Sequence, residues 1–398
     1  MVYWGSLILK LNQRAEVNMI NSIILFLWGI FIILFPFYFF KKSGIPQIAD
    51  YVMVIVIVLV FISSGLKLKK EIYPNVKDFI YFVSYIIFIN FIWTLLTSDT
   101  SILRNALFYF YNFLVFTTFL VTYSKVKEKL INVISYSIFI TIMLQVVLSF
   151  FYLDFSGFRQ TLFFNNPNQL GYFAILCAVI FFSISQHVKI KDIYQALFYL
   201  SIMYLVVLSL SKVSILAFVI FLVYLLKKHF IMLLFISILL MVVYPVVDEE
   251  MSLLSNLERR MDSIGQEADD SLAGRGYDRI INHPRYLLFG AGEGSTKRFE
   301  SMLPGELHSG LGTIFFSYGL VGFILFLKVL YGLFKPLHKN CSYILYTLPV
   351  FFYSLAHQSF RWPLFWMLMA IVFILHHNKT NNQTVLPEKT KDLNNKII

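Results

Sequence analysis

Apolar residues dominate this chain in long runs, and short polar stretches separate one run from the next. Most runs hold close to the ~20 residues that a helix needs to cross about 30 Å of hydrocarbon. The pattern predicts membrane-spanning helices at residues 20–40, 49–66, 78–97, 102–123, 130–152, 170–186, 193–210, 213–226, 230–247, 309–334, 342–356 and 363–376.

These runs are expected to be helices because a helix satisfies its own backbone hydrogen bonds in lipid. The sequence lacks the ten-residue alternation of a membrane β-barrel. Only 14% of the residues are charged, against about 25% in a soluble domain. The chain is therefore predicted to be an all-α polytopic membrane protein with about twelve transmembrane helices. The short spans 193–210 and 213–226 could instead form one long bent helix.

Polar segments divide the chain into four parts. Residues 1–247 hold nine predicted spans, 248–308 form one large hydrophilic loop, 309–377 hold three spans, and 378–398 form a polar tail that is expected to be disordered. Within the loop, apolar residues recur at helical spacing over 251–261 and 272–281, and Pro284 should end the second helix. The glycine-rich stretch 290–294 follows no βαβ pattern, so we interpret it as a turn and not as a nucleotide-binding loop.

The distribution of cationic residues predicts the orientation. With the N-terminus in the cytoplasm, cytoplasmic segments hold nineteen cationic residues and short outer connections hold six. The positive-inside rule then puts both termini in the cytoplasm and the loop outside. The distribution of the cationic residues over the predicted cytoplasmic segments accounts for the net charge of +11, so no nucleic-acid partner is expected.

Arginine and lysine are sorted differently in this orientation. Nine of the ten arginines lie outside or at the outer ends of spans. Arginine grips phosphate or carboxylate with two hydrogen bonds, so an anionic ligand is expected at the outer face. Salt bridging within the loop is the alternative, because residues 248–307 also carry twelve acidic side chains.

Several outer residues are candidates for binding that ligand. Asn166 and Pro167 have the pattern of a helix N-cap and first-turn proline, and with Asn168 they surround a helix N-terminus that suits phosphate or sugar hydroxyls. Lys212 interrupts an apolar stretch; it either extends to the headgroups or faces a cavity and binds phosphate.

The loop contributes two arginines and a histidine. Arg275 and Arg279 are four residues apart, which predicts that they share one helix face, with Asp278 as a neighbour in the alternative of a solvated helix. His308 lies where loop and membrane helix meet, and a neutral imidazole there can take a proton from a hydroxyl.

Four motifs together resemble the bacterial O-antigen ligase and polymerase superfamily. The main one is His308-Ser309, nine residues, then Gly319-Leu320-Val321-Gly322. The family has arginine where this chain has Lys212. The other three motifs, in the family's order, are Phe164-Asn165-Asn166-Pro167-Asn168, Leu210-Ser211-Lys212 and Gly274-Arg275.

The resemblance implies a C-type glycosyltransferase that is inverting and needs no metal or other cofactor. Its substrate would be an undecaprenyl-diphosphate-linked oligosaccharide at the outer face of the bacterial inner membrane. Arg275 would hold the diphosphate, with Lys212, Arg159 and Arg279 as further candidates. His308 would bind or deprotonate the acceptor hydroxyl. Membrane lipids, a chain-length regulator and a flippase are the partners that such an enzyme implies.

Two activities use this architecture. A polymerase joins lipid-linked repeat units, and the Phe- and Lys-rich composition favours it here. A ligase, which moves the finished glycan to lipid A-core or a protein, is the alternative. A lipid-linked oligosaccharide flippase is less favoured, because transporters commonly contain repeated halves and this chain shows no internal repeat.

Overall fold

The structure is a computed structural model. It describes residues 2–40, 44–64, 73–152, 159–223, 225, 253–263, 265–266, 271–299, 301, 305–335 and 342–384. These residues contain no strand. The helices, in chain order, are α1 (Val2–Leu34), α2 (Ile48–Ser64), α3 (Tyr73–Thr97), α4 (Ser101–Val126), α5 (Glu128–Tyr152), α6 (Pro167–Ser185), α7 (Asp192–Ser209), an apolar helix at Lys212–Val223, α9 (Leu253–Asp262), α10 (Asp278–Asn282), the 3-10 helices η2 (Pro284–Tyr286) and η3 (Thr296–Arg298), α11 (Gly310–Phe334), α12 (Ser342–Ser354) and α13 (Pro363–Thr384).

The prediction of an all-helical protein is confirmed for these residues. Six helices, α3 to α7 and α11, are long and apolar enough to cross a membrane. Eleven of the twelve predicted spans coincide with a helix. The remaining one, at 230–247, lies outside the described residues, as does most of the predicted tail.

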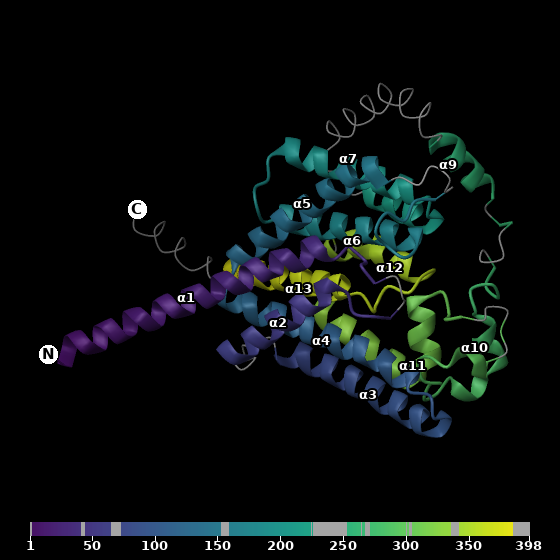
Figure 1. The fold of residues 1–398 in the computed structure, drawn as a ribbon. Helices are drawn as coiled ribbons and strands as arrows, with labels where there is room; N and C mark the ends of the chain where they lie inside the picture. Colours follow the sequence, from purple (N-terminus) through teal and green to yellow (C-terminus); the bar gives the residue numbers. More distant parts are fainter. Residues whose placement is uncertain are drawn as a thin grey trace, which may run out of the picture.

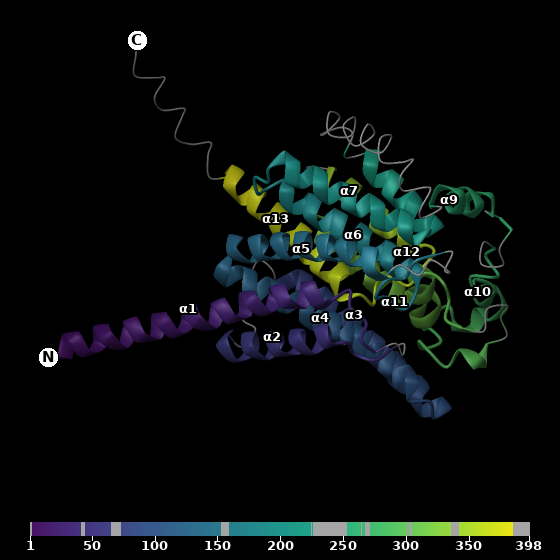
Figure 2. The ribbon, with the colours of Figure 1, turned by 45° about the horizontal axis from the view of Figure 1, so that its top comes forward.

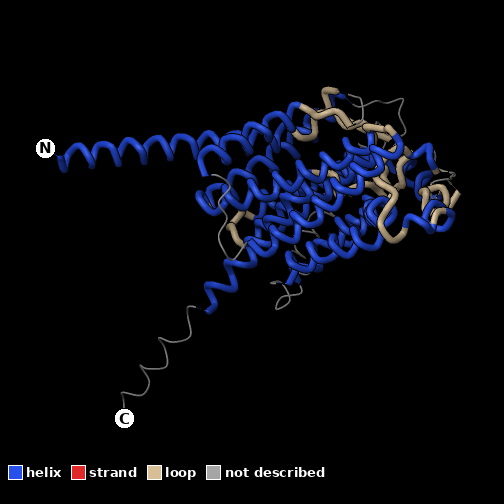
Figure 3. Tube along the Cα trace, turned by 90° about the horizontal axis from the view of Figure 1, so that it is seen from below, coloured by secondary structure: helices blue, strands red, loops and turns tan. Residues whose placement is uncertain are grey.

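The long helices form one bundle (Figure 1). The first residues of α1 lie at one end of the bundle, and α9 and α10 lie at the other (Figures 1 and 2). Most of the loop length also gathers at the end away from the N-terminus (Figure 3). The connections that carry the candidate residues therefore meet at a single end of the molecule.

Burial separates the central helices from the outer ones. On α6 every residue from Leu170 to Ile184 is buried, as expected for a helix that is apolar on all sides. α13 packs beside it, and its Trp366 ring stacks on Phe79 of α3 at 4.3 Å. α2 instead exposes one apolar stripe that includes Val58 and Ile62. The lipid-facing surface is thus built from the peripheral helices.

The two short spans near Ser211 form a hairpin and not one bent helix. α7 ends at Ser209, and Leu210 adopts the left-handed conformation (φ +45°) that commonly terminates a helix. The next helix begins at Lys212 and folds back, so that the rings of Tyr199 and Phe221 lie 5.9 Å apart. The alternative of a single helix is therefore wrong.

A backbone break divides α11, which the sequence predicts as continuous. Gly319 has φ +64°, a conformation that side chains rarely adopt. Loop residues pack at this break: the N–H groups of Leu320 and Val321 donate to the carbonyls of Leu287 and Leu288. A Cβ atom on Gly319 would lie 2.5 Å from the Leu288 carbonyl oxygen. Glycine is needed here because the loop backbone approaches so closely.

Candidate functional site

The hydrophilic loop has its own small apolar core. Ala291, Phe299, Leu307 and Phe316 are buried together. The helices predicted within the loop are present as α9 and a short α10, which ends before Pro284. Residues 290–294 form the expected turn, with positive φ at three of their glycines. The loop is therefore folded against the bundle end.

His308 and Arg275 lie together at this end. The backbone N–H of His308 donates to the Arg275 carbonyl at 2.9 Å. Arg275 donates from Nη1 to the Ala356 carbonyl at 2.8 Å. Ser309 caps α11, and its buried side chain accepts from the Gly312 N–H. The cap fixes the point at which the chain passes from His308 into the helix.

His357, which no sequence motif indicated, completes this group. Its ring centroid lies 6.3 Å from that of His308. Burial lowers the pKa of His357 from 6.5 to about 3, and nearby basic side chains add to the effect. In decreasing order these are Arg275, His308 and Arg159. His357 is therefore neutral at physiological pH and lies close to two arginines. We call these four residues the Arg–His cluster.

Arg159 links the cluster to the start of α6. Its Nη2 donates to Asn168 Oδ1 at 2.6 Å, and its Nε donates to the Ser209 carbonyl at 3.3 Å. The Asn168 carbonyl in turn accepts from Tyr353 Oη at 2.8 Å. Asn168 therefore positions an arginine of the cluster. Asn166 is the predicted N-cap of α6: its exposed side chain accepts a hydrogen bond from the Gln169 N–H.

Lys212 bonds to the loop. Its Nζ donates to the Ser263 carbonyl at 3.0 Å, just after α9. Arg260 of α9 donates to the Leu210 carbonyl at 3.3 Å beside it. These bonds attach the end of α9 to the turn that joins α7 and the following helix. The described contacts of Lys212 are thus structural.

Arg275 and Arg279 do not share a helix face, so that prediction is wrong. Gly276, between them, has φ +82°, which is not a helical conformation, and α10 begins only at Asp278. Arg279 is buried and donates to the Gly305 carbonyl at 2.6 Å. Burial also lowers its pKa below the ordinary value for arginine. Arg279 therefore belongs to a second site.

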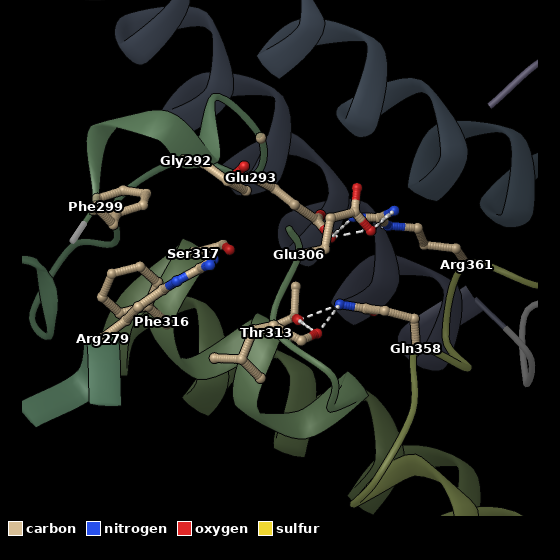
Figure 4. Close-up of a pocket in the computed structure, with 13 residues that line it drawn as sticks. Arg279, Gly292, Glu293, Phe299, Glu306, Thr313, Phe316, Ser317, Gln358 and Arg361 are labelled. Atoms are coloured by element: carbon tan, nitrogen blue, oxygen red, sulfur yellow. Dashed lines mark hydrogen bonds and ion pairs between the residues drawn. The ribbon is translucent and has the colours of Figure 1, made fainter. Parts of the chain in front are cut away.

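That second site is a small hollow, partly open to solvent, between the loop, α11 and the α12–α13 connection (Figure 4). Its charged lining residues are Arg279, Glu293, Glu306 and Arg361, and Phe299 and Phe316 add two aromatic rings. We call it the mixed-charge pocket.

Arg361 joins two carboxylates in this pocket. Its guanidinium binds Glu293 through Nε at 2.9 Å and also through Nη2, and Nη1 binds Glu306 at 2.9 Å. Glu293 is almost fully buried and also accepts from the Tyr318 hydroxyl. Attraction to Arg361 lowers the pKa of Glu306 below its ordinary 4.5. Both carboxylates are paired, so the pocket is close to electrically balanced.

The two sites share a wall. Leu307, next to His308, lines the pocket, and so does Gln358, next to His357. Gln358 Nε2 donates to the Leu307 carbonyl at 3.1 Å and also contacts Thr313 Oγ1. His308 and His357 therefore lie directly beside the pocket.

The α12–α13 connection carries site residues that no sequence motif indicated. His357, Gln358 and Arg361 lie within five positions, between two apolar spans. Such a polar group between apolar spans was the available signal. Arg361 is one of the six cations in the short outer connections of the predicted topology.

Among the residues that the structure describes, no group of three His, Cys, Asp or Glu side chains could hold a metal ion. No protein-family model matches this chain, and a search of curated proteins finds no match either. The resemblance of its motifs to the O-antigen ligase and polymerase superfamily therefore stays a prediction.

Proposed function

We propose that this chain is a membrane glycosyltransferase that polymerises glycan repeat units carried on a polyprenyl diphosphate. The observation that supports the proposal best is the Arg–His cluster. Two arginines from distant parts of the chain meet at His357, whose pKa is lowered by burial and further by their charges. Such a concentration of positive charge suits a diphosphate.

The chemistry needs little beyond this arrangement. The diphosphate is the leaving group, so cations that stabilise its developing charge lower the barrier. Arg275 and Arg159 would bind its oxygens. The guanidinium of Arg275 donates to a neutral oxygen, the Ala356 carbonyl. A diphosphate would therefore offer Arg275 stronger, charge-assisted bonds.

His308 would act on the acceptor. In the reaction, an acceptor hydroxyl oxygen bonds to the anomeric carbon, the bond from that carbon to the diphosphate oxygen breaks, and the hydroxyl proton passes to His308. The diphosphate leaves with the bonding electrons, and attack from the opposite face inverts the anomeric centre. Holding both substrates beside one imidazole supplies the proximity that the transfer requires.

The open side of the mixed-charge pocket would contact the acceptor sugar. Its carboxylates and arginines balance one another, which suits an uncharged, hydroxyl-rich ligand better than a diphosphate. Glu306, whose side chain is 45% exposed, offers carboxylate oxygens to hydroxyl donors there. The shared wall would bring a hydroxyl at this position next to His308.

A cell-based test uses a strain in which the chromosomal copy is deleted. Plasmid-borne His308→Ala and Arg275→Ala should each abolish chain extension while the protein still inserts. Arg285→Ala is the matched control, because Arg285 is an exposed arginine of the same loop that lies over the Tyr286 ring. Polysaccharide length on gels is the readout.

Normal-length polysaccharide from either cluster variant would overturn the site. The deletion strain also identifies the activity. Single repeat units attached to their final acceptor indicate a polymerase, whereas accumulated lipid-linked polymer indicates a ligase.

A further inference from the structure

The turn around Phe289 packs against the side of a membrane helix. Tyr85 Oη donates to the Phe289 carbonyl at 2.8 Å, and Trp93 Nε1 donates to the Gly290 carbonyl at 3.0 Å. α3 continues to Thr97. At 1.5 Å per residue, Tyr85 is about 18 Å and Trp93 about 6 Å short of that end. The turn therefore contacts α3 well below its terminus.

The surface of α3 remains apolar beyond these contacts. Leu95 and Leu96, closer to the helix end, are 65% and 69% exposed. Exposed leucines at that height belong in hydrocarbon, so the membrane boundary lies near Thr97 or beyond it. The Phe289 turn is then on the hydrocarbon side of the boundary.

The backbone of this turn meets the requirement for such a location. Irregular backbone is tolerated at membrane depth only where the protein satisfies its polar groups. Carbonyls along the turn accept bonds from Leu320, Val321, Tyr85, Trp93 and Arg298, and the N–H groups of Ala291 and Gly292 donate to Phe316 and Ser317. The break at Gly319 exposes the α11 backbone groups that make several of these bonds.

Two apolar side chains of the turn point outward. Leu288 is 52% exposed and Phe289 is 60% exposed. Leu320 and Ile324 of the adjoining half of α11 are also exposed, at 44% and 54%. Along the helix axes, the outward surface of the turn is thus level with the exposed apolar surfaces of two membrane helices.

We propose that residues 286–292 form a re-entrant segment that enters the outer half of the bilayer, with Leu288 and Phe289 in contact with lipid acyl chains. The segment belongs to the loop predicted to be external, and it re-enters the hydrocarbon without crossing it. The inference does not depend on the proposed enzyme activity. It assigns the glycine turn and the Gly319 break a common purpose, which is to carry backbone into lipid with its hydrogen bonds satisfied.

Fluorescence quenching in proteoliposomes tests this. In a Cys341→Ser background, where Cys177 is fully buried, a bimane label is attached to full-length Phe289→Cys. Two controls bracket it: Phe88→Cys on the lipid-facing side of α3 and Lys297→Cys at an exposed, charged position of the loop. Lipids brominated on the acyl chain quench from the hydrocarbon, and iodide quenches from water.

The label at Phe289 should be quenched by brominated lipid as strongly as that at Phe88, and several-fold less by iodide than that at Lys297. Strong iodide quenching without a bromolipid effect would put the turn outside the membrane. Protection from both quenchers would also overturn the proposal, because protein and not lipid would then cover Phe289. Leu288→Cys provides the same measurement if Phe289→Cys does not yield folded protein.

Discussion

The Arg–His cluster and the mixed-charge pocket lie on two sides of one wall, but Arg275 of the cluster and Arg361 of the pocket have different partners. In the pocket, Arg361 is held between two carboxylates, one of them almost fully buried. In the cluster, the Arg275 guanidinium donates to a backbone carbonyl, that of Ala356. Burial lowers the pKa of the neighbouring His357 to about 3, and the charge of Arg275 adds to the effect.

The difference separates a structural use of charge from a functional one. Buried ion pairs hold elements in register, and removing one partner leaves an expensive unpaired charge. An arginine that bonds neutral oxygens retains attraction for an anion. We therefore expect changes in the pocket to affect folding first and changes in the cluster to affect activity first.

The largest expected effect is that of Arg361→Ala. It leaves the buried Glu293 carboxylate without its partner, at a cost of about 3–5 kcal/mol. Heating followed by size-exclusion chromatography should show a large loss of folded protein. The double variant Arg361→Met with Glu293→Gln should recover much of the lost stability, because no buried charge is then left unpaired. Equal stability of the single and double variants would contradict a structural role for this pair.

Arg275→Ala should have the opposite profile. Loss of its bond to Ala356 should cost stability only about 1 kcal/mol, whereas transfer should slow by about 10²–10³-fold, as when one transition-state donor is removed. Purified protein with a lipid diphosphate-linked donor provides the rate, and thermal unfolding provides the stability. If Arg275→Ala lowers the Tm as much as Arg361→Ala and the folded fraction retains activity, then Arg275 has a structural role like that of Arg361 and the distinction between the two sites is wrong.

His357 should make stability depend on pH. Its pKa is about 3 in the folded protein and 6.5 in the unfolded chain, so the unfolded chain binds the additional proton between these values. Stability is therefore lost as the pH falls below 6.5, by about 1.4 kcal/mol per unit, or roughly 2 kcal/mol at pH 5. Unfolding curves of His357→Gln should depend less on pH over this range. Parallel curves would show that neither burial nor the cluster lowers the pKa of His357 in the folded protein.

The smallest effect is expected at Asn166. Its side chain caps α6, so Asn166→Ala should lower stability by about 1 kcal/mol and Asn166→Ser by less. Activity per folded molecule should not change in either. A loss of activity in Asn166→Ala at unchanged stability would instead return Asn166 to substrate binding, as the sequence motif suggests.

Much of the fold could be predicted because membrane spans are local features. A run of apolar residues identifies its own helix, and eleven predicted spans coincide with one. The break at Gly319 could not be predicted, because glycine within an apolar run is common and only the approach of the loop requires φ +64°. The error over Arg275 and Arg279 has a similar cause, since Gly276 breaks a spacing that otherwise fits a helix.

The candidate site was predictable in its residue types but not in its grouping. His308 and Arg275 belong to short motifs and Arg159 was a further candidate for binding the diphosphate; the structure brings the three around one residue, His357. His357 itself lies 49 positions beyond His308 in sequence, and only tertiary packing brings the two together. Lys212 belongs to a motif and Arg279 was a further candidate, but their described bonds hold the loop in place.

The complete enclosure of α6 has a consequence for how the protein tolerates change. A methyl group on Gly171 would collide with Ser214 Oγ at 2.3 Å and Ser209 Oγ at 2.9 Å, and every position from Leu170 to Ile184 is similarly surrounded. In a saturation scan, nearly every substitution in α6 should therefore reduce the amount of folded protein. In α2 the sensitive positions should recur every 3.6 residues, on the buried face of the helix. Random variation in this protein is then expected to accumulate at its periphery and to spare its axis.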